Sequence, residues 1–179
     1  MNEQRKVLVT GGTGYIGSHA CVSLIEAGYT PVVLDNLSNS SPVVLERIEA
    51  VTGVRPRFVE GDIRDEAMLH ALLAEERPGA VMHFAGLKAV GESVAQPERY
   101  QDNNVGGTEC LLRAMEAVEL RRLVFSSSAT VYGDPDAVPI AEDAPMRTTN
   151  PYGQTKLDVE RLLAARHRDN PRWSVACLR

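Results

Sequence analysis

Two side chains near the end of the sequence could act together on a proton. They are Tyr152 and Lys156, in the segment Tyr152-Gly-Gln-Thr-Lys156. A spacing of four residues on a helix places the phenol and the ammonium group on one face, within reach of each other or of a shared ligand. A free phenol has a pKa near ~10 and is a poor base at neutral pH, but a nearby Lys charge lowers that pKa. Such a tyrosine can take a proton from an alcohol that is being oxidised. The alternative interpretation is a surface tyrosine beside a solvated lysine.

A candidate binding turn for a dinucleotide, the usual partner of such an oxidation, lies near the N-terminus. The apolar run 7–9 leads into Thr10-Gly-Gly-Thr-Gly-Tyr-Ile-Gly17, after which the sequence has a helical period. Gly12, Gly14 and Gly17 have the spacing Gly-x-Gly-x-x-Gly, which is informative only between a strand and a helix, as here. These glycines allow a tight turn and let a pyrophosphate approach the N–H groups at a helix N-terminus. A tight turn that binds nothing is the alternative.

A carboxylate further along favours the dinucleotide interpretation. A second β-rich run, 30–34, ends in Asp35. A dinucleotide-binding fold places at about this position the acidic residue that binds the adenosine ribose hydroxyls. We expect NAD rather than its 2′-phosphorylated form, because a 2′-phosphate would meet a like charge. The competing interpretation is an aspartate that only forms a turn.

Alternating strand and helix patterns must bring these groups together. Apolar runs predict strands at about 7–10, 30–34, 57–60, 80–84, 123–127 and 173–178. Helices are predicted directly after the glycine turn, from Ser41 as N-cap to about Thr52, after an Asp65 cap, and over about 97–118 and 151–168. The stretch between the fourth strand and residue 97 is predicted to be irregular, and 130–150 to be a loop.

This alternation predicts an α/β fold, a doubly wound parallel sheet of Rossmann type with strand order 3-2-1-4-5-6. Ligands bind such a sheet at the carboxyl ends of its strands. The glycine turn, Asp35, Asp62, the segment 84–88 and the serines 126–128 all follow predicted strands, so we expect them along one rim. A chain of 179 residues suits one well-buried domain, and we interpret 1–179 as an NAD-binding domain.

The composition argues against several other classes of function. A hydrophobic content of 44% with 24% charged residues is ordinary for a soluble protein, and a net charge of −5 argues against a nucleic-acid surface. We expect no membrane span, because no apolar stretch is long enough, and no signal peptide, because the first residues run straight into a strand. Cys21, Cys110 and Cys177 are odd in number and far apart, which favours reduced thiols in a cytoplasmic protein. The histidines and cysteines lack ligand-like spacing, so no metal site is expected.

The motifs resemble those of the extended short-chain dehydrogenase/reductases, which act on nucleotide sugars. The glycine turn and the Tyr-x-x-x-Lys pair carry this resemblance. Longer strings extend it: Asp35-Asn-Leu, Phe58-Val-Glu-Gly-Asp-Ile-Arg64, His83-Phe-Ala-Gly-Leu-Lys-Ala-Val-Gly-Glu-Ser93 and Ser126-Ser-Ser-Ala-Thr-Val-Tyr-Gly133. Together these are similar to the UDP-hexose 4-epimerases of the family over nearly the whole chain, from Lys6 to Arg179.

The resemblance implies hydride removal from C4 of UDP-glucose or UDP-galactose to tightly held NAD, and return of hydride to the other face of the sugar. It makes Tyr152 the proton acceptor, Lys156 a ligand of the nicotinamide ribose that lowers the tyrosine pKa, and Ser128 the partner of the 4-oxygen. The implied substrate contacts are Lys88, Ser128 and Tyr152. The implied cofactor contacts are Gly11, Gly14, Tyr15, Ile16, Gly17, Asp35, Asn36, Asp62, Ile63, Phe84, Ala85, Gly86, Lys88, Asn103, Tyr152 and Lys156.

Family members run to nearly twice this length, and commonly form homodimers. The resemblance therefore implies that a final strand and a substrate domain are missing, that this chain alone is weakly active or inactive, and that an apolar sheet face and a sheet edge are exposed. Other nucleotide-sugar epimerases, a 4,6-dehydratase and an NAD-binding module without activity remain as alternatives. Dehydratases of the family carry acidic residues directly after the Ser/Thr of the strand-five motif. Here that place reads Ser128-Ala129-Thr130, which favours an epimerase.

Overall fold

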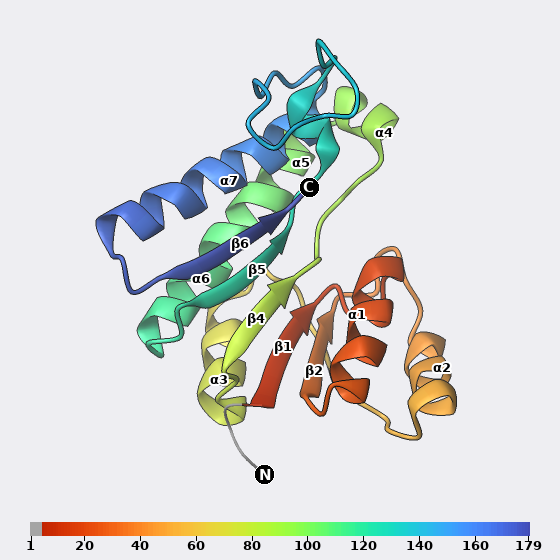
Figure 1. The fold of residues 1–179 in the computed structure, drawn as a ribbon. Coiled ribbons are helices and arrows are strands. Elements are labelled where there is room, and N and C mark those ends of the chain that lie inside the picture. Colours follow the sequence, from red (N-terminus) through yellow and green to blue (C-terminus); the bar gives the residue numbers. More distant parts are fainter. Residues whose placement is uncertain (1–4) are drawn as a thin grey trace.

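The computed structural model describes residues 5–179, and six parallel strands form its centre (Figure 1). The strand order is β3-β2-β1-β4-β5-β6, which confirms the predicted Rossmann-type fold. The order reverses between β1 and β4, and this is the point at which such sheets bind ligands. The expectation that the chain has no signal peptide concerns its first residues, of which 1–4 lie outside the described part. The strands are β1 (Lys6–Thr10), β2 (Thr30–Asp35), β3 (Arg57–Glu60), β4 (Ala80–His83), β5 (Arg122–Ser126) and β6 (Ser174–Leu178).

Helices cover both faces of the sheet, so most strands are buried on both sides, as in other parallel sheets. Helices α1 and α2 pack on one face and α3, α6 and α7 on the other (Figure 1). Alternate residues of each strand enter the two cores: Val9 packs toward α1 and α2, while Leu8 packs toward α3 and α6. The helices are α1 (Tyr15–Glu26), α2 (Val43–Thr52), α3 (Glu66–Glu76), α4 (Val90–Ala95), α5 (Pro97–Tyr100), α6 (Gly107–Ala117) and α7 (Pro151–Asp169).

Some predicted helices differ from the observed ones. The predicted Ser41 cap is wrong by one residue: Pro42 occupies the N-cap position of α2, and Ser41 Oγ accepts only a long 3.4 Å hydrogen bond from the Val43 N–H. The predicted Asp65 cap is confirmed, because its side chain accepts from the Met68 N–H over 2.9 Å.

The region around the predicted helix 97–118 is more divided than its sequence period indicates. Helix α4 forms in the stretch predicted to be irregular, and a π-helical segment, Gln101–Gly106, separates α5 from α6. Gln96 has φ −135° and ψ 58°, in keeping with the bias of residues before a proline away from helical angles. The predicted loop 130–150 begins inside a short 3₁₀ helix, Ala129–Tyr132, and β5 ends at Ser126, one residue before the predicted end of that strand.

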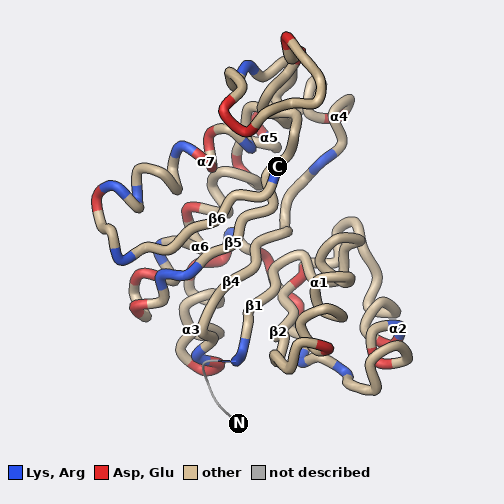
Figure 2. The backbone as a smooth tube through the Cα atoms, viewed as in Figure 1, with Lys and Arg blue, Asp and Glu red and all other residues tan. Residues whose placement is uncertain are grey.

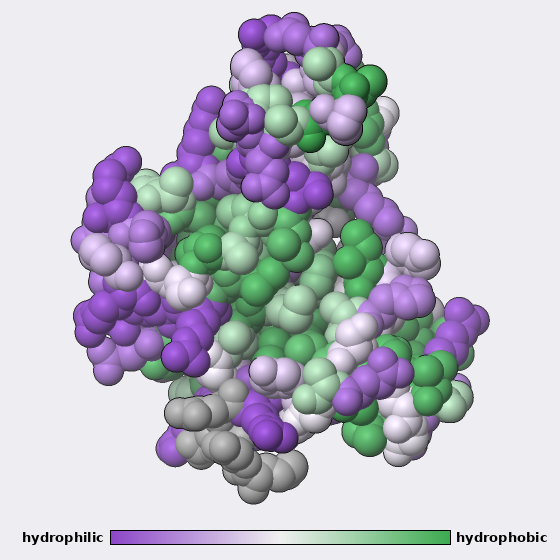
Figure 3. All heavy atoms as spheres, viewed as in Figure 1, coloured by the Kyte–Doolittle hydropathy of each residue, from purple (hydrophilic) through white to green (hydrophobic). Residues whose placement is uncertain are grey.

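One face of β5 and β6 is not covered by a helix. Val175 and Cys177 pack toward α7, so alternation directs Ala176 and Leu178 to the opposite side. Leu178 is 54% exposed there, and Figure 3 shows an apolar surface over this part of the sheet. The expected exposure of an apolar sheet face is therefore present in the structure.

Charges of both signs are interspersed over the helices and loops (Figure 2). Within residues 5–179, no helix is both long enough and apolar enough to cross a membrane. The three cysteines are free thiols; Cys21 is buried and the other two are half-buried. The described residues also contain no group of three or more His, Cys, Asp or Glu side chains placed to hold a metal ion.

Candidate active site

The glycine turn joins β1 to α1 and brings main chain against main chain. Gly11 has φ +69°, a conformation that favours glycine. A Cβ atom on Gly11 would lie 2.6 Å from the Ala85 nitrogen, and one on Gly17 would lie 2.9 Å from Gly12 Cα. The turn therefore packs directly on the segment that follows β4, and α1 packs directly on the turn, with no space for side chains at these contacts.

The N-terminus of α1 is open toward this turn. Its N-cap residue is Gly14, which has no side chain to cap the helix, and its first turn contains no acidic residue. Tyr15 and Ile16, the first two helical residues, are 76% and 58% exposed. The free N–H groups of a helix N-terminus carry partial positive charge and bind phosphate groups. This end of α1 is thus suited to a pyrophosphate.

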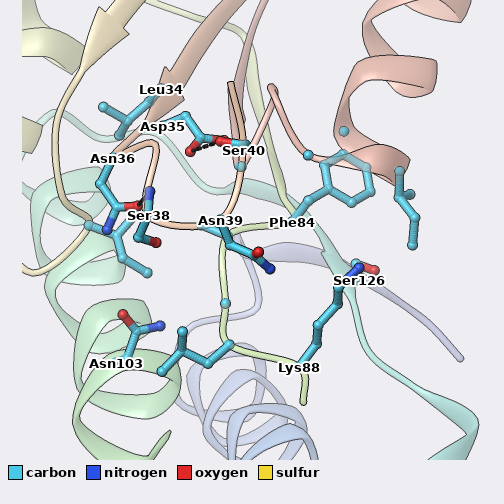
Figure 4. Close-up of a pocket in the computed structure, with 18 of the residues that line it drawn as sticks. Leu34, Asp35, Asn36, Ser38, Asn39, Ser40, Phe84, Lys88, Asn103 and Ser126 are labelled. Carbon is cyan, nitrogen blue, oxygen red and sulfur yellow. Dashed lines mark hydrogen bonds between the residues drawn. The ribbon is translucent and has the colours of Figure 1, made fainter. Parts of the chain in front are cut away.

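A cavity extends along the carboxyl ends of the central strands (Figure 4). In Figure 4, Asp35 and Ser40 lie at one end of it and Lys88 and Ser126 at the other. Most of the residues that the resemblance assigns to the cofactor line this cavity: Gly11, Gly14, Tyr15, Ile16, Gly17, Asp35, Asn36, Ile63, Phe84, Ala85, Gly86, Lys88 and Asn103.

Asp62, Tyr152 and Lys156 do not line the cavity. Instead, the Asp62 carboxylate accepts hydrogen bonds from the Arg64 guanidinium group and from Asn36 Nδ2, at 2.8 and 3.0 Å, and the Arg64 contact holds its pKa well below the usual range. Sequence reasoning missed several lining residues, although a polar run directly after Asp35, at a strand end, was an available signal for some of them. The missed residues are Leu34, Ser38, Asn39, Ser40 and Gly61, whereas Leu87 and Ser126 lie in segments that the sequence places on this rim.

The Asp35 carboxylate is held by main-chain and side-chain donors from two loops. Oδ2 accepts from the Thr13 N–H in the glycine turn over 3.2 Å. Oδ1 accepts from the Leu37 N–H and from Ser40 Oγ, each at 3.0 Å. Asp35 therefore joins the glycine turn to the loop after β2 and keeps a fixed orientation at the edge of the cavity.

The π-helical segment connects the loop after β4 with α7 through Asn104. Asn104 Oδ1 accepts from the Leu87 N–H over 2.8 Å, and its Nδ2 donates to the Leu87 oxygen over 2.9 Å. The same Nδ2 donates to Thr155 Oγ1 over 3.1 Å. Neighbouring Asn103 lines the cavity. This segment thus fixes the loop that carries Lys88 relative to the helix that carries Tyr152.

Lys156 is buried on the face of α7 that points to the end of β5. Its Nζ donates to the Ser126 oxygen over 2.8 Å and lies 4.7 Å from the centroid of the Phe125 ring. The same nitrogen is 5.9 Å from the centroid of the Tyr152 ring, so the two side chains share one face of the helix, as their spacing predicts. Burial lowers the pKa of Lys156 to about 8.

The effect of Lys156 on the pKa of Tyr152, which the resemblance implies, stays a prediction. Burial of the Tyr152 phenol raises its pKa above the usual value, and a hydrogen bond with Ser128 opposes part of that rise. Ser128 Oγ accepts from the Thr130 N–H and Oγ1, at 3.2 and 2.9 Å, which leaves its own hydrogen to be donated to the phenol. The Lys156 ammonium group donates to the Ser126 oxygen rather than to the phenol.

Residues 7–179 match the sequence profile of the NAD dependent epimerase/dehydratase family. The chain belongs to this family.

Relatives within the epimerase/dehydratase family are similar over almost the whole chain. A UDP-glucose 4-epimerase of Bacillus subtilis (strain 168) is 55% identical over 173 residues, covering 97% of this chain and 51% of that protein. A UDP-glucose-4-epimerase structure from Stenotrophomonas maltophila, with bound NAD and formylated UDP-arabinopyranose, has a TM-score of 0.96 and 50% identity, covering 98% of this chain and 52% of its own. A UDP-glucose 4-epimerase structure from Bifidobacterium longum, in complex with NAD⁺ and UDP, has a TM-score of 0.95 and 48% identity. The match covers 97% of this chain and 52% of that one.

These comparisons confirm the resemblance to epimerases that the motifs indicate. The chain spans about half the length of the curated relatives it matches.

Proposed function

We propose that the complete polypeptide is a UDP-glucose 4-epimerase that interconverts UDP-glucose and UDP-galactose with NAD, and that residues 1–179 form its NAD-binding domain. One observation carries this proposal: the Tyr152 phenol, its Ser128 partner and buried Lys156 are assembled at the end of β5, on the same rim as the dinucleotide cavity. The names and bound molecules of the relatives support it.

The cavity fits NAD on three counts. The open N-terminus of α1 can bind the pyrophosphate through its N–H groups. The oriented Asp35 carboxylate, with Asn36 beside it, can bind the ribose hydroxyls of the adenosine and disfavours a 2′-phosphate. Ala85, Gly86, Lys88 and Asn103 line the remainder of the cavity. When bound, NAD would supply hydride acceptance and return at C4 of the sugar.

The residues at the end of β5 would then accept and return the proton of the 4-hydroxyl group. Tyr152 would accept that proton, and Ser128 would hydrogen-bond the 4-oxygen and favour the phenolate by donating to it. Lys156 would bind the nicotinamide ribose, and its positive charge and that of an oxidised nicotinamide both favour the phenolate. A dehydratase is disfavoured because neither Ala129 nor Thr130 offers a carboxylate after Ser128.

The test is interconversion of UDP-glucose and UDP-galactose by the complete polypeptide and by Tyr152→Phe. Loss of the general base is expected to lower kcat by about 10²- to 10⁴-fold. Tyr29→Phe, at an exposed position between the C-terminal end of α1 and β2, is the matched control and should retain full turnover. Unchanged turnover in Tyr152→Phe would contradict the mechanism. Binding of NAD without interconversion of either sugar would support the alternative of a non-enzymatic NAD-binding module.

We further propose a cytoplasmic homodimer that acts in galactose metabolism, as the resemblance implies. The 179-residue chain by itself is expected to bind NAD but to have little epimerase activity, because transition-state positioning needs a closed site. Light scattering on the complete polypeptide measures the oligomeric state. Substantial activity of residues 1–179 alone would contradict the second expectation.

A further inference from the structure

One face of α7 contacts three consecutive serines at the end of β5. The contacting residues of α7 are four positions apart, so they lie above one another on the helix. Each meets a different serine, through a side chain or a main-chain oxygen. The pairs are Tyr152 with Ser128, Lys156 with the oxygen of Ser126, and Glu160 with Ser127.

The first two pairs belong to the site already described, but Glu160 does not. Ser127 Oγ donates a hydrogen bond to Glu160 Oε1. Both side chains are buried, with residue exposures of 8% for Ser127 and 7% for Glu160. A buried carboxylate is tolerated only with charged or hydrogen-bonding partners, so the arrangement around Glu160 is tightly specified.

Arg179 supplies the opposite charge to Glu160. Its Nη2 donates to Glu160 Oε2 over 2.7 Å, and its Nε is 3.1 and 3.2 Å from the two carboxylate oxygens. Arg179 Nη1 donates further to Tyr132 Oη and to the Glu142 oxygen, at 2.7 and 3.0 Å. Burial and the Glu160 charge also raise the pKa of nearby Cys177 to about 11. Glu160 is therefore fixed from the side of β6 as well as from the end of β5.

The contact with Glu160 matters because strand pairing fixes only the first of the three serines. The β5–β6 ladder ends at the pair Ser126–Leu178, so Ser127 and Ser128 lie beyond it. The Ser127 N–H turns back to the Phe125 oxygen over 3.1 Å, and Ser128 already caps the 3₁₀ helix that follows. The chain thus changes direction at Ser127, and the contact with Glu160 is its side-chain anchor to α7.

We propose that Glu160 is a positioning residue for proton transfer: by holding Ser127, it fixes the Ser128 hydroxyl opposite the Tyr152 phenol. This inference rests on the proposed function for its effect on turnover. Glu160 touches neither the proposed substrate nor the cofactor cavity, and it acts only through the serine beside Ser128. Because Glu160 and Tyr152 are on the same rigid helix, their separation is constant, and the anchor sets the distance from serine to phenol.

The test compares Glu160→Gln, Ser127→Ala and Ser127→Thr in the complete polypeptide. Glu160→Gln and Ser127→Ala are expected to lower kcat by about 10- to 100-fold, since small misplacement of reacting groups has effects of this size. The KM for UDP-glucose and the binding of NAD should stay close to the parent values. Ser127→Thr should keep kcat close to the parent value because it keeps the hydroxyl group. Asp158→Asn is the matched control on the same helix: its carboxylate meets Gln154 and Arg161, and turnover should not change.

A second measurement separates positioning from a purely structural role. The pKa of Tyr152, taken as the phenolate absorbance that disappears in Tyr152→Phe, should rise in Ser127→Ala and Glu160→Gln, because Ser128 no longer donates from a fixed place. Unchanged kcat per folded molecule together with an unchanged Tyr152 pKa would overturn the proposal, whatever happens to the melting temperature. If the parent protein does not interconvert the sugars but the pKa still rises, the proposed function fails and the positioning role stands. Should Glu160→Gln fail to fold, the two Ser127 variants decide the question.

Discussion

The main-chain N–H of Tyr152 donates a hydrogen bond to Ser93 Oγ over 3.2 Å. The first N–H groups of a helix have no acceptor within the helix. In α7, Pro151 has no N–H, and the Gly153 N–H donates to Asn150 Oδ1 over 2.8 Å. The Tyr152 N–H lies between these two residues, and fully buried Ser93 provides its acceptor. Helix α4 is thereby fixed to α7 at the residue proposed to act as the base.

The Ser93→Ala variant should therefore be destabilised. It leaves the Tyr152 N–H without its acceptor, and an unsatisfied buried donor costs about 1–3 kcal/mol. The free energy of unfolding from urea denaturation measures this loss. Ser23→Ala, at an exposed position of α1, should not lower stability because Ala favours the helix at least as well as Ser does. Equal stability of the two variants would show that the hydrogen bond to Ser93 is not a significant support of α7.

The Gly17→Ala variant is expected to lose NAD binding. A Cβ atom at Gly17 would meet the oxygen of Gly11 and approach Gly12 Cα to 2.9 Å, and all of these atoms belong to the main chain of the turn. The turn or α1 must shift, and the N–H groups aimed at the pyrophosphate shift with it. Calorimetric titration with NAD measures the effect. Gly91→Ala is the matched control: a Cβ there has no neighbour within 4 Å, so affinity should be retained.

The Asp35→Asn variant tests the preference for NAD. The single amide oxygen can accept from the Thr13 N–H or from the Leu37 N–H but not from both, because the amide nitrogen then faces the other donor. The amide also lacks the charge that disfavours a 2′-phosphate. The ratio of the dissociation constants of NADP and NAD is expected to fall by about tenfold, the size of one hydrogen bond to a charged group. Glu60→Gln, on the exposed neighbouring position of β3, should leave that ratio unchanged. An unaltered ratio in Asp35→Asn would place the selectivity elsewhere.

The strands and their order could be predicted because the signals are local. Each strand is an apolar run with a turn signal at its end, and the glycine turn with Asp35 indicates which ends meet a ligand. The π-helical segment could not be predicted in this way, because Gln101–Gly106 contains no proline and nothing local distinguishes it from the α-helices around it. Its function appears only when Asn104 is seen between Leu87 and Thr155, residues distant in sequence.

The same limit applies to the site. Spacing correctly places Tyr152 and Lys156 on one face of a helix, but spacing does not report burial, and burial determines the direction of both pKa shifts. Likewise, helical spacing does not show whether Glu160 is exposed, and the structure buries it against Ser127. Side-chain pairs across elements depend on how the elements pack, which no short pattern encodes.

Buried His83 should make the protein sensitive to acid. Its Nδ1 lies 2.6 Å from Thr10 Oγ1 and its Nε2 lies 2.9 Å from Thr108 Oγ1, and burial lowers its pKa from 6.5 to about 3. Between these two values the unfolded chain holds a proton that the folded chain does not. Stability therefore falls as the pH drops below 6.5, by up to about 1.4 kcal/mol per pH unit from this group.

Replacing His83 by Gln removes the contribution of this proton to the pH dependence of stability. Urea denaturation between pH 4 and pH 7 should give a shallower pH dependence for His83→Gln than for the parent, about one proton less in slope. His70→Gln, at an exposed position of α3, should retain the parent's slope. Parallel curves for His83→Gln and the parent would mean that His83 binds its proton equally in the folded and unfolded chains, which contradicts the lowered pKa.

Lys156→Met should separate stability from activity. Burial lowers the pKa of Lys156 from 10.5 to about 8, so at pH 7 the folded protein carries a buried ammonium group at a cost of about 3 kcal/mol. Above pH 8 the folded chain releases this proton before the unfolded chain does, and the cost disappears as the pH rises to 10.5.

Met fills the same space without charge, although the Ser126 oxygen loses its donor. The variant should therefore unfold at higher urea concentration than the parent at pH 7, with a difference that shrinks toward pH 10, while epimerase turnover is lost. A lower stability than the parent at pH 7 would show that the contacts with Ser126 and Phe125 fully offset the cost of burying the charge.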